Sequence, residues 1–268
     1  MIGQTRIPWR DRVKRTMPVV THAVRLARLL RNQIRYPVAA TVLDLHGRIL
    51  GGPFAGVRFA RSGIANYPQI LGSYEQCLVP LVERIVRDPP PTIIDVGAAY
   101  GYYALGFAQR CPDTRVIAYE MDPTRAALLH KYRRRNGFDG RVDARAIQCS
   151  TRDLAQDLRS ATRSLIFMDV EGAEDALLVP DEVPRLCQAE IIVELHEIFV
   201  PGVTARIRQR FADSHHQTLL EEQPPDRAAI PAWADRLVRP YWRRMTFEDR
   251  PSRNTWLHLV PNTVAAAQ

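Results

Sequence analysis

The sequence lacks long hydrophobic runs and paired cysteines. No continuous apolar stretch reaches the roughly 18 residues that a membrane-spanning helix needs. The opening stretch, MIGQTRIPWRDRVKR, lacks the apolar core and small-residue cleavage site of a signal peptide. The cysteines at positions 77, 111, 149 and 187 lie far apart and form no C-x-x-C pair, so neither a zinc site nor a disulfide framework is expected. We therefore expect a cytoplasmic protein with reduced thiols.

Lysine is also scarce. Lys14 and Lys131 are the only lysines, so arginine carries almost all of the net charge of +8. Such an excess is consistent with the genome composition of a bacterium, although guanidinium groups also bind phosphate in a bidentate manner. The basic residues are scattered and form no cluster interleaved with aromatic residues. Nucleic acid is therefore not an expected partner.

A proline-rich stretch, RDPPP at residues 87–91, divides the chain of 268 residues. It predicts an N-terminal extension over residues 1–88 and a main domain over residues 89–268. Residues 11–36 have the spacing of a basic amphipathic helix. This helix could rest on an anionic membrane surface, which would make the protein membrane-peripheral. The alternative is that it packs on its own domain or on a second subunit of a homodimer.

The rest of the extension predicts short elements. Residues 40–60 alternate apolar runs with four glycines, which favours a β-hairpin or two short strands. The next segment, QILGSYEQCLVPLVERIV, predicts a helix that begins near Ser73, with Ser73 as its N-cap and Glu75 in its first turn.

The main domain alternates strands with helices. Five apolar segments predict buried strands, over residues 92–96, 115–120, 142–147, 164–170 and 190–195. Two later segments, over residues 216–222 and 254–260, predict an antiparallel pair. Between the first strands, helices are expected up to about residue 110 and up to Gly137. Such a series indicates an α/β fold with a parallel sheet covered on both faces, which binds ligands at the carboxyl ends of its strands.

A glycine-rich turn follows the first of these strands. In IIDVGAAYGYYAL, Asp95 lies at the strand end, and Gly97 and Gly101 lead into a helix. Glycine lets the backbone approach a ligand, and a helix N-terminus offers free N–H groups. The pattern matches neither G-x-G-x-x-G nor a P-loop. Glu120 ends the second strand, where an acid can accept hydrogen bonds from a ribose diol.

The order of these residues resembles the cofactor site of class I S-adenosylmethionine (SAM) methyltransferases. In that family the glycine turn faces the methionine part of SAM, and the acid holds the ribose. Asp122, just beyond Glu120, is interpreted as a helix cap. The resemblance implies that SAM is bound by residues at the ends of the first four strands: Asp95, Gly97, Ala98, Tyr100, Gly101, Tyr102, Glu120, Met121, Gln148, Cys149 and Asp169.

The segment after the fourth strand, MDVEG, differs from the motifs of two kinds of DNA methyltransferase. It has neither the Asn/Asp-Pro-Pro-Tyr/Phe loop of amino-methylating DNA enzymes nor the Pro-Cys nucleophile of cytosine-C5 enzymes. With LGSYEQ, DVGAAYGYYAL, DVEGAE and IIVELHE, residues 50–258 resemble FkbM-type methyltransferases. This implies a Rossmann-like, seven-stranded sheet with its last pair antiparallel, and O-methylation of a sugar or natural-product hydroxyl. It also places Tyr74 and Glu75 beside the cofactor. Ala99 departs from the family pattern, which has Asn there.

Acids and one histidine follow the fourth and fifth strands. We expect Glu171 to contact the acceptor, Asp169 to face the cofactor or act as a base, and His196, with an ordinary pKa near 6.5, to be a second candidate base. Glu194 shares a strand face with His196. Metal is not predicted, because the Asp-Asn pair of catechol-type enzymes is absent. Glu174 and Asp175, in DVEGAEDALL, are interpreted as first-turn residues of the next helix.

The sequence thus predicts a SAM-dependent methyltransferase that acts on a small-molecule, glycan or glycolipid hydroxyl. Two alternatives stay open. The pI of about 9.7 favours an RNA methyltransferase. A SAM-binding module without catalysis would have the same glycine turn.

Overall fold

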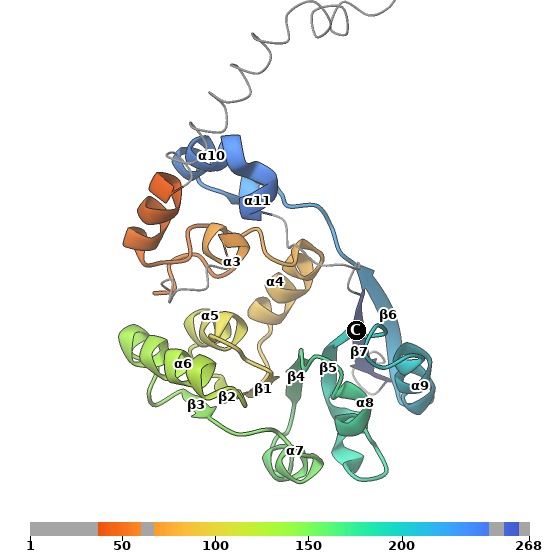
Figure 1. Cartoon of the computed structure of the whole chain (residues 1–268). Helices are drawn as coiled ribbons and strands as arrows, with labels where there is room; N and C mark the ends of the chain where they lie inside the picture. Colours follow the sequence, from red (N-terminus) through yellow and green to blue (C-terminus); the bar gives the residue numbers. More distant parts are fainter. Residues whose placement is uncertain (1–36, 60–66, 247–254, 263–268) are drawn as a thin grey trace, which may run out of the picture. The chain divides into compact units, whose positions relative to one another are not determined.

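The computed structural model describes residues 37–59, 67–246 and 255–262 (Figure 1). The predicted basic helix over residues 11–36 lies outside these ranges. The chain divides into two units between His46 and Gly47. In the described part of the first unit, residues 37–46 are helical. The elements discussed below belong to the second unit, which begins at Gly47 and so includes residues 47–88.

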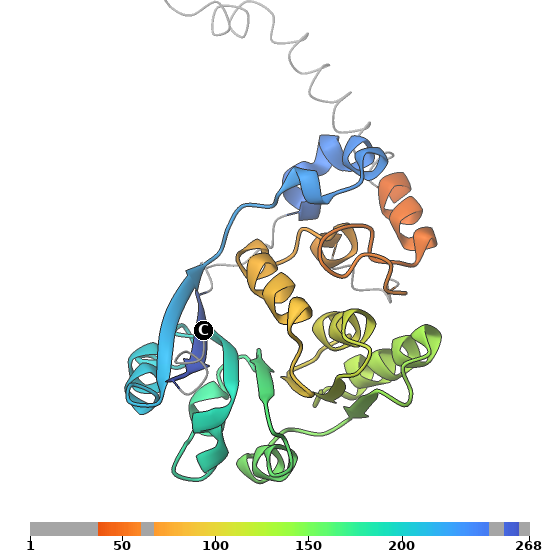
Figure 2. The same cartoon turned by 180° about the vertical axis from the view of Figure 1, so that it is seen from behind.

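A seven-stranded sheet forms the centre of the second unit, with strand order β3-β2-β1-β4-β5-β7-β6 (Figures 1 and 2). The first five strands pair in parallel, and β7 pairs antiparallel with both β5 and β6. The predicted fold class, including the antiparallel last pair, is confirmed. The strands are β1 (Thr92–Val96), β2 (Arg115–Tyr119), β3 (Val142–Arg145), β4 (Ser164–Met168), β5 (Glu190–Leu195), β6 (His215–Glu221) and β7 (Thr255–Pro261).

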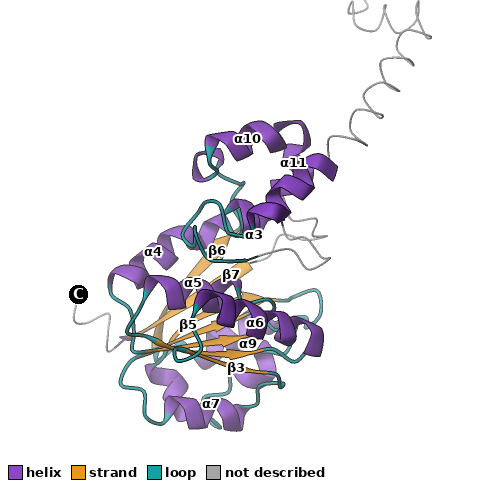
Figure 3. Cartoon of the chain, turned by 90° about the vertical axis from the view of Figure 1, so that its left-hand side faces the viewer, coloured by secondary structure: helices purple, strands orange, loops and turns teal. Residues whose placement is uncertain are grey.

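The central strands are continuous apolar runs because helices cover both of their faces. In Figure 3, α4 and α5 lie on one side of the strands and α7 on the other. Leucines of α7 and apolar residues of α9 join the core on one face of the sheet. The helices of the domain are α3 (Tyr67–Leu71), α4 (Val79–Arg87), α5 (Tyr102–Arg110), α6 (Pro123–Asn136), α7 (Thr151–Leu158), α8 (Glu174–Leu177), α9 (Val203–Arg210), α10 (Ala232–Val238) and α11 (Trp242–Thr246).

The strand order reverses between β1 and β4, and this reversal positions the site. The two strands pair in register up to Val96 and Met168, so the chain leaves both at the same edge. The amide of Asp169 donates a hydrogen bond of 3.0 Å to the carbonyl of Val96. A Cβ atom at Gly97 would lie 1.8 Å from the carbonyl oxygen of Asp169. Only glycine fits where these two loops meet.

The ends of α6 follow from local sequence. The side chain of Asp122 accepts a hydrogen bond of 2.8 Å from the amide of Arg125, as the predicted N-cap should. Gly137 ends the helix with φ of +73°, a left-handed conformation that costs glycine little. Both predictions for this helix are confirmed.

The short strands predicted for residues 40–60 are wrong for the described part of that range. Residues 40–46 are helical, and residues 47–59 contain turns but no strand. Ile49 and Val57 do share a backbone hydrogen bond of 2.9 Å. Glycines with positive φ at positions 47, 52 and 56 turn the chain too often for a ladder to form.

The predicted helix start at Ser73 is also wrong. A 3₁₀ turn over Gln76–Leu78 precedes α4, and Leu78 rather than Ser73 flanks that helix. The Ser73 hydroxyl is buried and forms no hydrogen bond. The cause is the preceding glycine: a Cβ atom at Gly72 would lie 2.0 Å from the backbone of Gly51. This close crossing of two chain segments, rather than a helix cap, fixes the backbone here.

None of the helices in the described ranges is long and apolar enough to cross a membrane.

Candidate functional site

The glycine turn after β1 is held in place by Glu120. Its carboxylate accepts a hydrogen bond of 2.8 Å from the amide of Ala99 and another of 2.7 Å from the amide of Asp122. Ala99 has a left-handed backbone with φ of 47°, which aims its N–H at Glu120. The acid that ends the second strand therefore shapes the turn as well as facing the space in front of it.

A cavity of about 400 Å³ lies at the carboxyl ends of β1, β2 and β4. This volume is within the range of small-molecule sites. Six of the predicted cofactor residues line it: Gly97, Glu120, Met121, Gln148, Cys149 and Asp169. Sequence reasoning missed further lining residues, which lie on neighbouring turns: Arg125, Ile147, Ser150, Thr151, Val170 and Glu182. Three of the six, Ile147, Ser150 and Val170, adjoin a predicted residue in the chain, so adjacency was the available signal for these three.

A second cavity, of about 30 Å³, shares Gly97, Ala99 and Asp169 with the first. Its remaining lining includes Gln69, Tyr74, Asp95, Ala98 and Tyr102. Three oxygens of its lining residues are buried without a hydrogen-bond partner: Oε1 of Gln69, Oδ2 of Asp95 and Oδ1 of Asp169. Buried acceptors without a donor favour a ligand that brings donors, such as an ammonium group.

Asp95 has an unusual charge state in this environment. Burial, together with the nearby acids Asp169 and Glu120, raises the pKa of its carboxyl to about 8, although a hydrogen bond from the backbone of Ala104 opposes the shift. At neutral pH the group is therefore mostly protonated. A cation bound beside it would favour the carboxylate form.

Three residues predicted to bind the cofactor line neither cavity: Glu75, Tyr100 and Gly101. The carboxylate of Glu75 is buried and accepts a hydrogen bond from the hydroxyl of Tyr103. Gly101 serves packing instead, because a Cβ atom there would lie 2.4 Å from the side chain of Leu129 in α6. Glu75 and Gly101 thus contact other parts of the domain, and a role of these three residues in cofactor binding stays a prediction.

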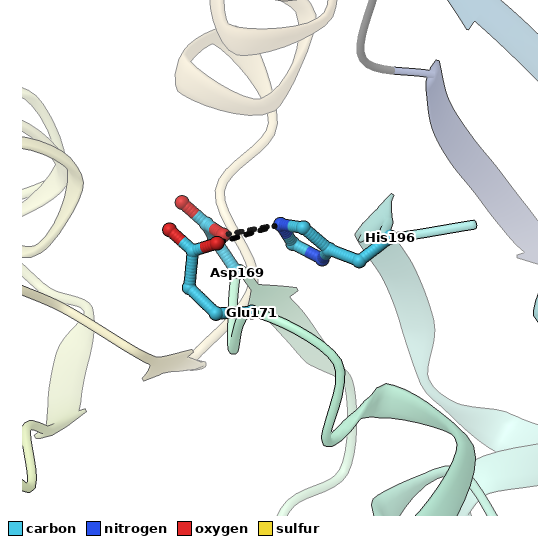
Figure 4. Close-up of side chains that lie close together, drawn as sticks. All are labelled: Asp169, Glu171 and His196. Atoms are coloured by element: carbon cyan, nitrogen blue, oxygen red, sulfur yellow. Dashed lines mark ion pairs between the residues drawn. The ribbon is translucent and has the colours of Figure 1, made fainter. Parts of the chain in front are cut away.

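The predicted catalytic residues come together at the ends of β4 and β5 (Figure 4). Nε2 of His196 lies 3.5 Å from Oδ1 of Asp169, 3.4 Å from Oε2 of Glu171 and 3.7 Å from Oε2 of Glu194. His196 and Glu194 are buried, whereas the Glu171 side chain is 70% exposed and lines the larger cavity. Glu171 is thus the most exposed member of the cluster.

Sequence reasoning missed the role of Glu174. It lies in the first turn of α8, as expected, but it is fully buried. Oε1 of Glu174 is 3.3 Å from Nδ1 of His196 and accepts a hydrogen bond of 2.8 Å from the amide of the same residue. The available sequence signal for this contact was spacing, since Glu174 follows Glu171 by three residues.

The acids around His196 change its pKa. Burial alone would lower it, but Glu174, Asp169 and Glu171 more than offset this effect, and the net shift is upward. Glu197, the residue after His196, accepts hydrogen bonds from the amides of Gly202 and Thr204 at the start of α9.

The cluster also has the dimensions of a cation site. Ligand atoms of Asp169, Glu171 and His196 all lie within 4.8 Å of one another. Acidic groups at a surface often adopt such spacing without a metal, and the absence of a metal stays a prediction.

Comparison with known proteins shows that this chain is similar to other proteins in structure only. No family model and no curated protein matches the chain. An rRNA methylase from Streptococcus thermophilus is 8% identical over 70% of this chain and 98% of its own, with a TM-score of 0.46. An O-methyltransferase from Bacillus cereus in complex with SAH is 14% identical over 66% and 77%, with a TM-score of 0.42. TomG of Streptomyces achromogenes, an O-methyltransferase of tomaymycin synthesis in complex with SAM, is 16% identical over 69% and 78%, with a TM-score of 0.41.

Proposed function

We propose that this chain is a SAM-dependent O-methyltransferase of the FkbM type, which methylates a hydroxyl of a small molecule, glycan or glycolipid. The observation that carries the proposal is the pair of cavities that share Gly97, Ala99 and Asp169. One is large enough for a nucleoside, and the other is lined by unpaired acceptor oxygens. SAM combines an adenosine with an amino acid, so the larger cavity suits its nucleoside and the oxygens of the smaller one suit its ammonium group.

The residues around the cavities suit the parts of SAM. Glu120 ends the second strand at the larger cavity, where a carboxylate can accept hydrogen bonds from a ribose diol. Gln148 and Cys149 offer an amide and an apolar edge to the adenine. Gln69, Asp95 and Asp169 offer acceptor oxygens to the ammonium group. When bound, SAM supplies an electrophilic methyl group on a positively charged sulfur.

The acceptor hydroxyl would approach from the exposed side of the cluster. Glu171 can accept its hydrogen bond, and His196 lies 3.4 Å behind Glu171. The exposed side chains of Ile198 and Phe199 follow directly, and the Phe199 ring stacks on His196 with centroids 5.9 Å apart. An apolar face beside polar groups favours an acceptor such as a sugar or a ring-containing natural product.

The reaction needs a positioned hydroxyl and an acceptor for its proton, and different side chains would supply these two functions. Positioning of the hydroxyl against the methyl group supplies much of the rate, because it makes the encounter intramolecular. Nε2 of His196 accepts the hydroxyl proton, directly or through Glu171, and the neighbouring acids Asp169 and Glu194 stabilise the resulting imidazolium. General-base assistance of this kind contributes a factor of about 10² to 10⁴.

The test is transfer of a radiolabelled methyl group from SAM into separated pools of cell extract. Small molecules, glycans with glycolipids, and RNA are incubated separately with the full chain, and binding of SAM is measured by calorimetry. We expect label in the small-molecule or glycan pool. Label confined to RNA would favour the RNA methyltransferase, and SAM binding without label in any pool would favour the non-catalytic module.

A matched pair of variants controls this test. His196→Gln should lower transfer about 10²-fold or more and leave SAM affinity within about twofold. Asp181→Asn changes an exposed acid that lines neither cavity and belongs to no part of the cluster, and it should leave transfer unchanged. Equal activity of His196→Gln and the unmutated chain would contradict the assignment of the base.

A further inference from the structure

Glu174 is a fully buried carboxylate in a helix of only four residues. Burying an acid costs free energy unless hydrogen bonds or an opposite charge compensate. The side chain does not contribute to the apolar core, and no sequence rule for helix starts requires it to be buried. The position therefore needs an explanation in its contacts.

Those contacts join the two loops that form the catalytic cluster. Oε2 of Glu174 accepts a hydrogen bond of 2.9 Å from the amide of Gly172, in the loop after β4. Oε1 accepts one of 2.8 Å from the amide of His196, at the end of β5, and lies 3.3 Å from Nδ1 of the same histidine. One carboxylate thus accepts a hydrogen bond from the backbone of His196 and lies at ion-pair distance from Nδ1 of its ring, although the geometry at Nδ1 is not that of a hydrogen bond.

The other charged groups near His196 lie on the opposite side of its ring. Asp169 at the end of β4, Glu171 in the following turn and Glu194 on β5 all approach Nε2, at 3.4 to 3.7 Å. Among the described residues, Glu174 alone forms an ion pair at Nδ1. A proton on Nδ1 is stabilised by Glu174, and the lone pair of the neutral ring is then left on Nε2, towards the cavity.

We propose that Glu174 is the positioning residue of the proton acceptor: it fixes the ring of His196 and its tautomer so that Nε2 faces Asp169, Glu171 and the acceptor. This inference rests on the proposed function. Glu174 does not touch the substrate and acts through His196. The arrangement follows the principle by which a buried acid orients the histidine base of Ser-His-Asp hydrolases.

The charge states agree with this role. Burial raises the pKa of Glu174, but its hydrogen bonds with His196 and with backbone amides outweigh burial and hold the carboxyl pKa below its usual value. Glu174 therefore remains ionised beside His196 at neutral pH, as an orienting anion must.

The test is the titration of His196 in the full chain, followed by NMR of histidine side chains and assigned with His196→Gln. In Glu174→Gln, which keeps the shape but removes the charge, we expect the midpoint for His196 to move to lower pH. We also expect a shift in the pH dependence of kcat, measured by labelled methyl transfer into the pool that becomes methylated. The pH at which kcat falls on the acidic side should move in the same direction as the His196 midpoint. The value of kcat at its plateau should fall about 10- to 100-fold, the order expected when a buried ion pair loses its anion.

Three controls separate positioning from folding. Asp181→Asn should leave the His196 titration unchanged. Glu174→Asp, which keeps the charge on a shorter side chain, should bring the midpoint of the His196 titration part of the way back to its value in the unmutated chain. In a His196→Gln background, Glu174→Gln should cause little further loss of kcat, because the two residues act as one unit.

An unchanged His196 titration in Glu174→Gln would overturn the inference, whatever the stability of the variant. Additive losses of kcat in the double variant would overturn it as well. Because the titration needs neither SAM nor an acceptor, it reports on Glu174 even if no pool is methylated and the proposed function fails.

Discussion

Three described residues with side chains have left-handed backbones: besides Glu75, with φ of 43°, they are Ala99 and Glu171, with φ of 47° and 51°. This conformation costs an L-residue about 1–2 kcal/mol, and it persists where surrounding contacts hold it. At Ala99 the contact is the hydrogen bond to Glu120, and at Glu171 the conformation places the carboxylate beside His196. Ala99 and Glu171 lie on the wall of the larger cavity, where they shape the binding site.

Binding of SAM should release protons at neutral pH. Burial raises the pKa of Asp95 to about 8, so the free protein holds a proton there that a bound ammonium group would displace. Calorimetry in buffers of different ionisation enthalpy should detect the release near pH 7 and little release above pH 9, where Asp95 is already ionised. In Asp95→Asn the release should disappear and the affinity should fall about 10- to 100-fold. Equal proton release by this variant would exclude Asp95 as the source.

Gly97→Ala should abolish SAM binding. The new Cβ would lie 1.8 Å from the carbonyl oxygen of Asp169, and the φ of +86° is unfavourable for alanine. We expect the free energy of unfolding to fall by about 2 kcal/mol or more, measured by chemical denaturation. Gly140→Ala is the control, since a Cβ atom there meets nothing within 4 Å. Normal SAM affinity in Gly97→Ala would show that the two loops move apart at little cost.

At the scale of elements, β6 begins with a buried histidine that makes the sheet sensitive to acid. Nε2 of His215 is 2.9 Å from the carbonyl of Ala189, just before β5, and Nδ1 is 2.8 Å from the hydroxyl of Ser214. Burial lowers the pKa of His215, and the hydrogen bond to Ala189 offsets this only in part. The folded protein therefore binds this proton less readily than the unfolded chain.

The sign of the pH effect follows from that difference. Below about pH 6.5 the unfolded chain takes up a proton at this position that the folded protein does not, so the free energy of unfolding falls as pH falls. The slope from one such group is at most about 1.4 kcal/mol per pH unit. Chemical denaturation of His215→Gln near pH 7 and near pH 5 should show a smaller decrease than the unmutated chain. A decrease of equal size in both would assign the acid sensitivity to other groups.

At the scale of the whole molecule, the candidate site is contained in the second unit. Every residue that lines the two cavities lies between Gln69 and Glu182. A chain without residues 1–36 should therefore bind SAM with an affinity within about twofold of the full chain. Co-sedimentation with anionic vesicles should be lost if the basic segment is the membrane contact that its sequence predicts. Vesicle binding that persists without residues 1–36 would assign it to the arginines of the second unit.

Local rules predicted much of the fold. The apolar runs of β1, β4 and β5 predicted their own strands, since buried parallel strands have no polar face. Asp122 and Gly137 marked the ends of α6 because caps act within one turn. The same rules were wrong at residues 40–60 and at Ser73, where crossing chain segments decide the backbone through close contact at Gly51 and Gly72. Such crossings join residues far apart in sequence and leave no local pattern.

The sequence by itself determined which residues could meet. Acids and a histidine at the ends of successive parallel strands must lie at one edge of the sheet, and this placed Asp169, Glu171, Glu194 and His196 together. Only the tertiary structure decided what each contributes. Glu120 shapes the glycine turn, Glu75 accepts a hydrogen bond from Tyr103, and Glu174 is buried against His196. Strand order fixes which backbones are neighbours, but burial and side-chain direction depend on the packing of α8 and its loops, which no short sequence pattern specifies.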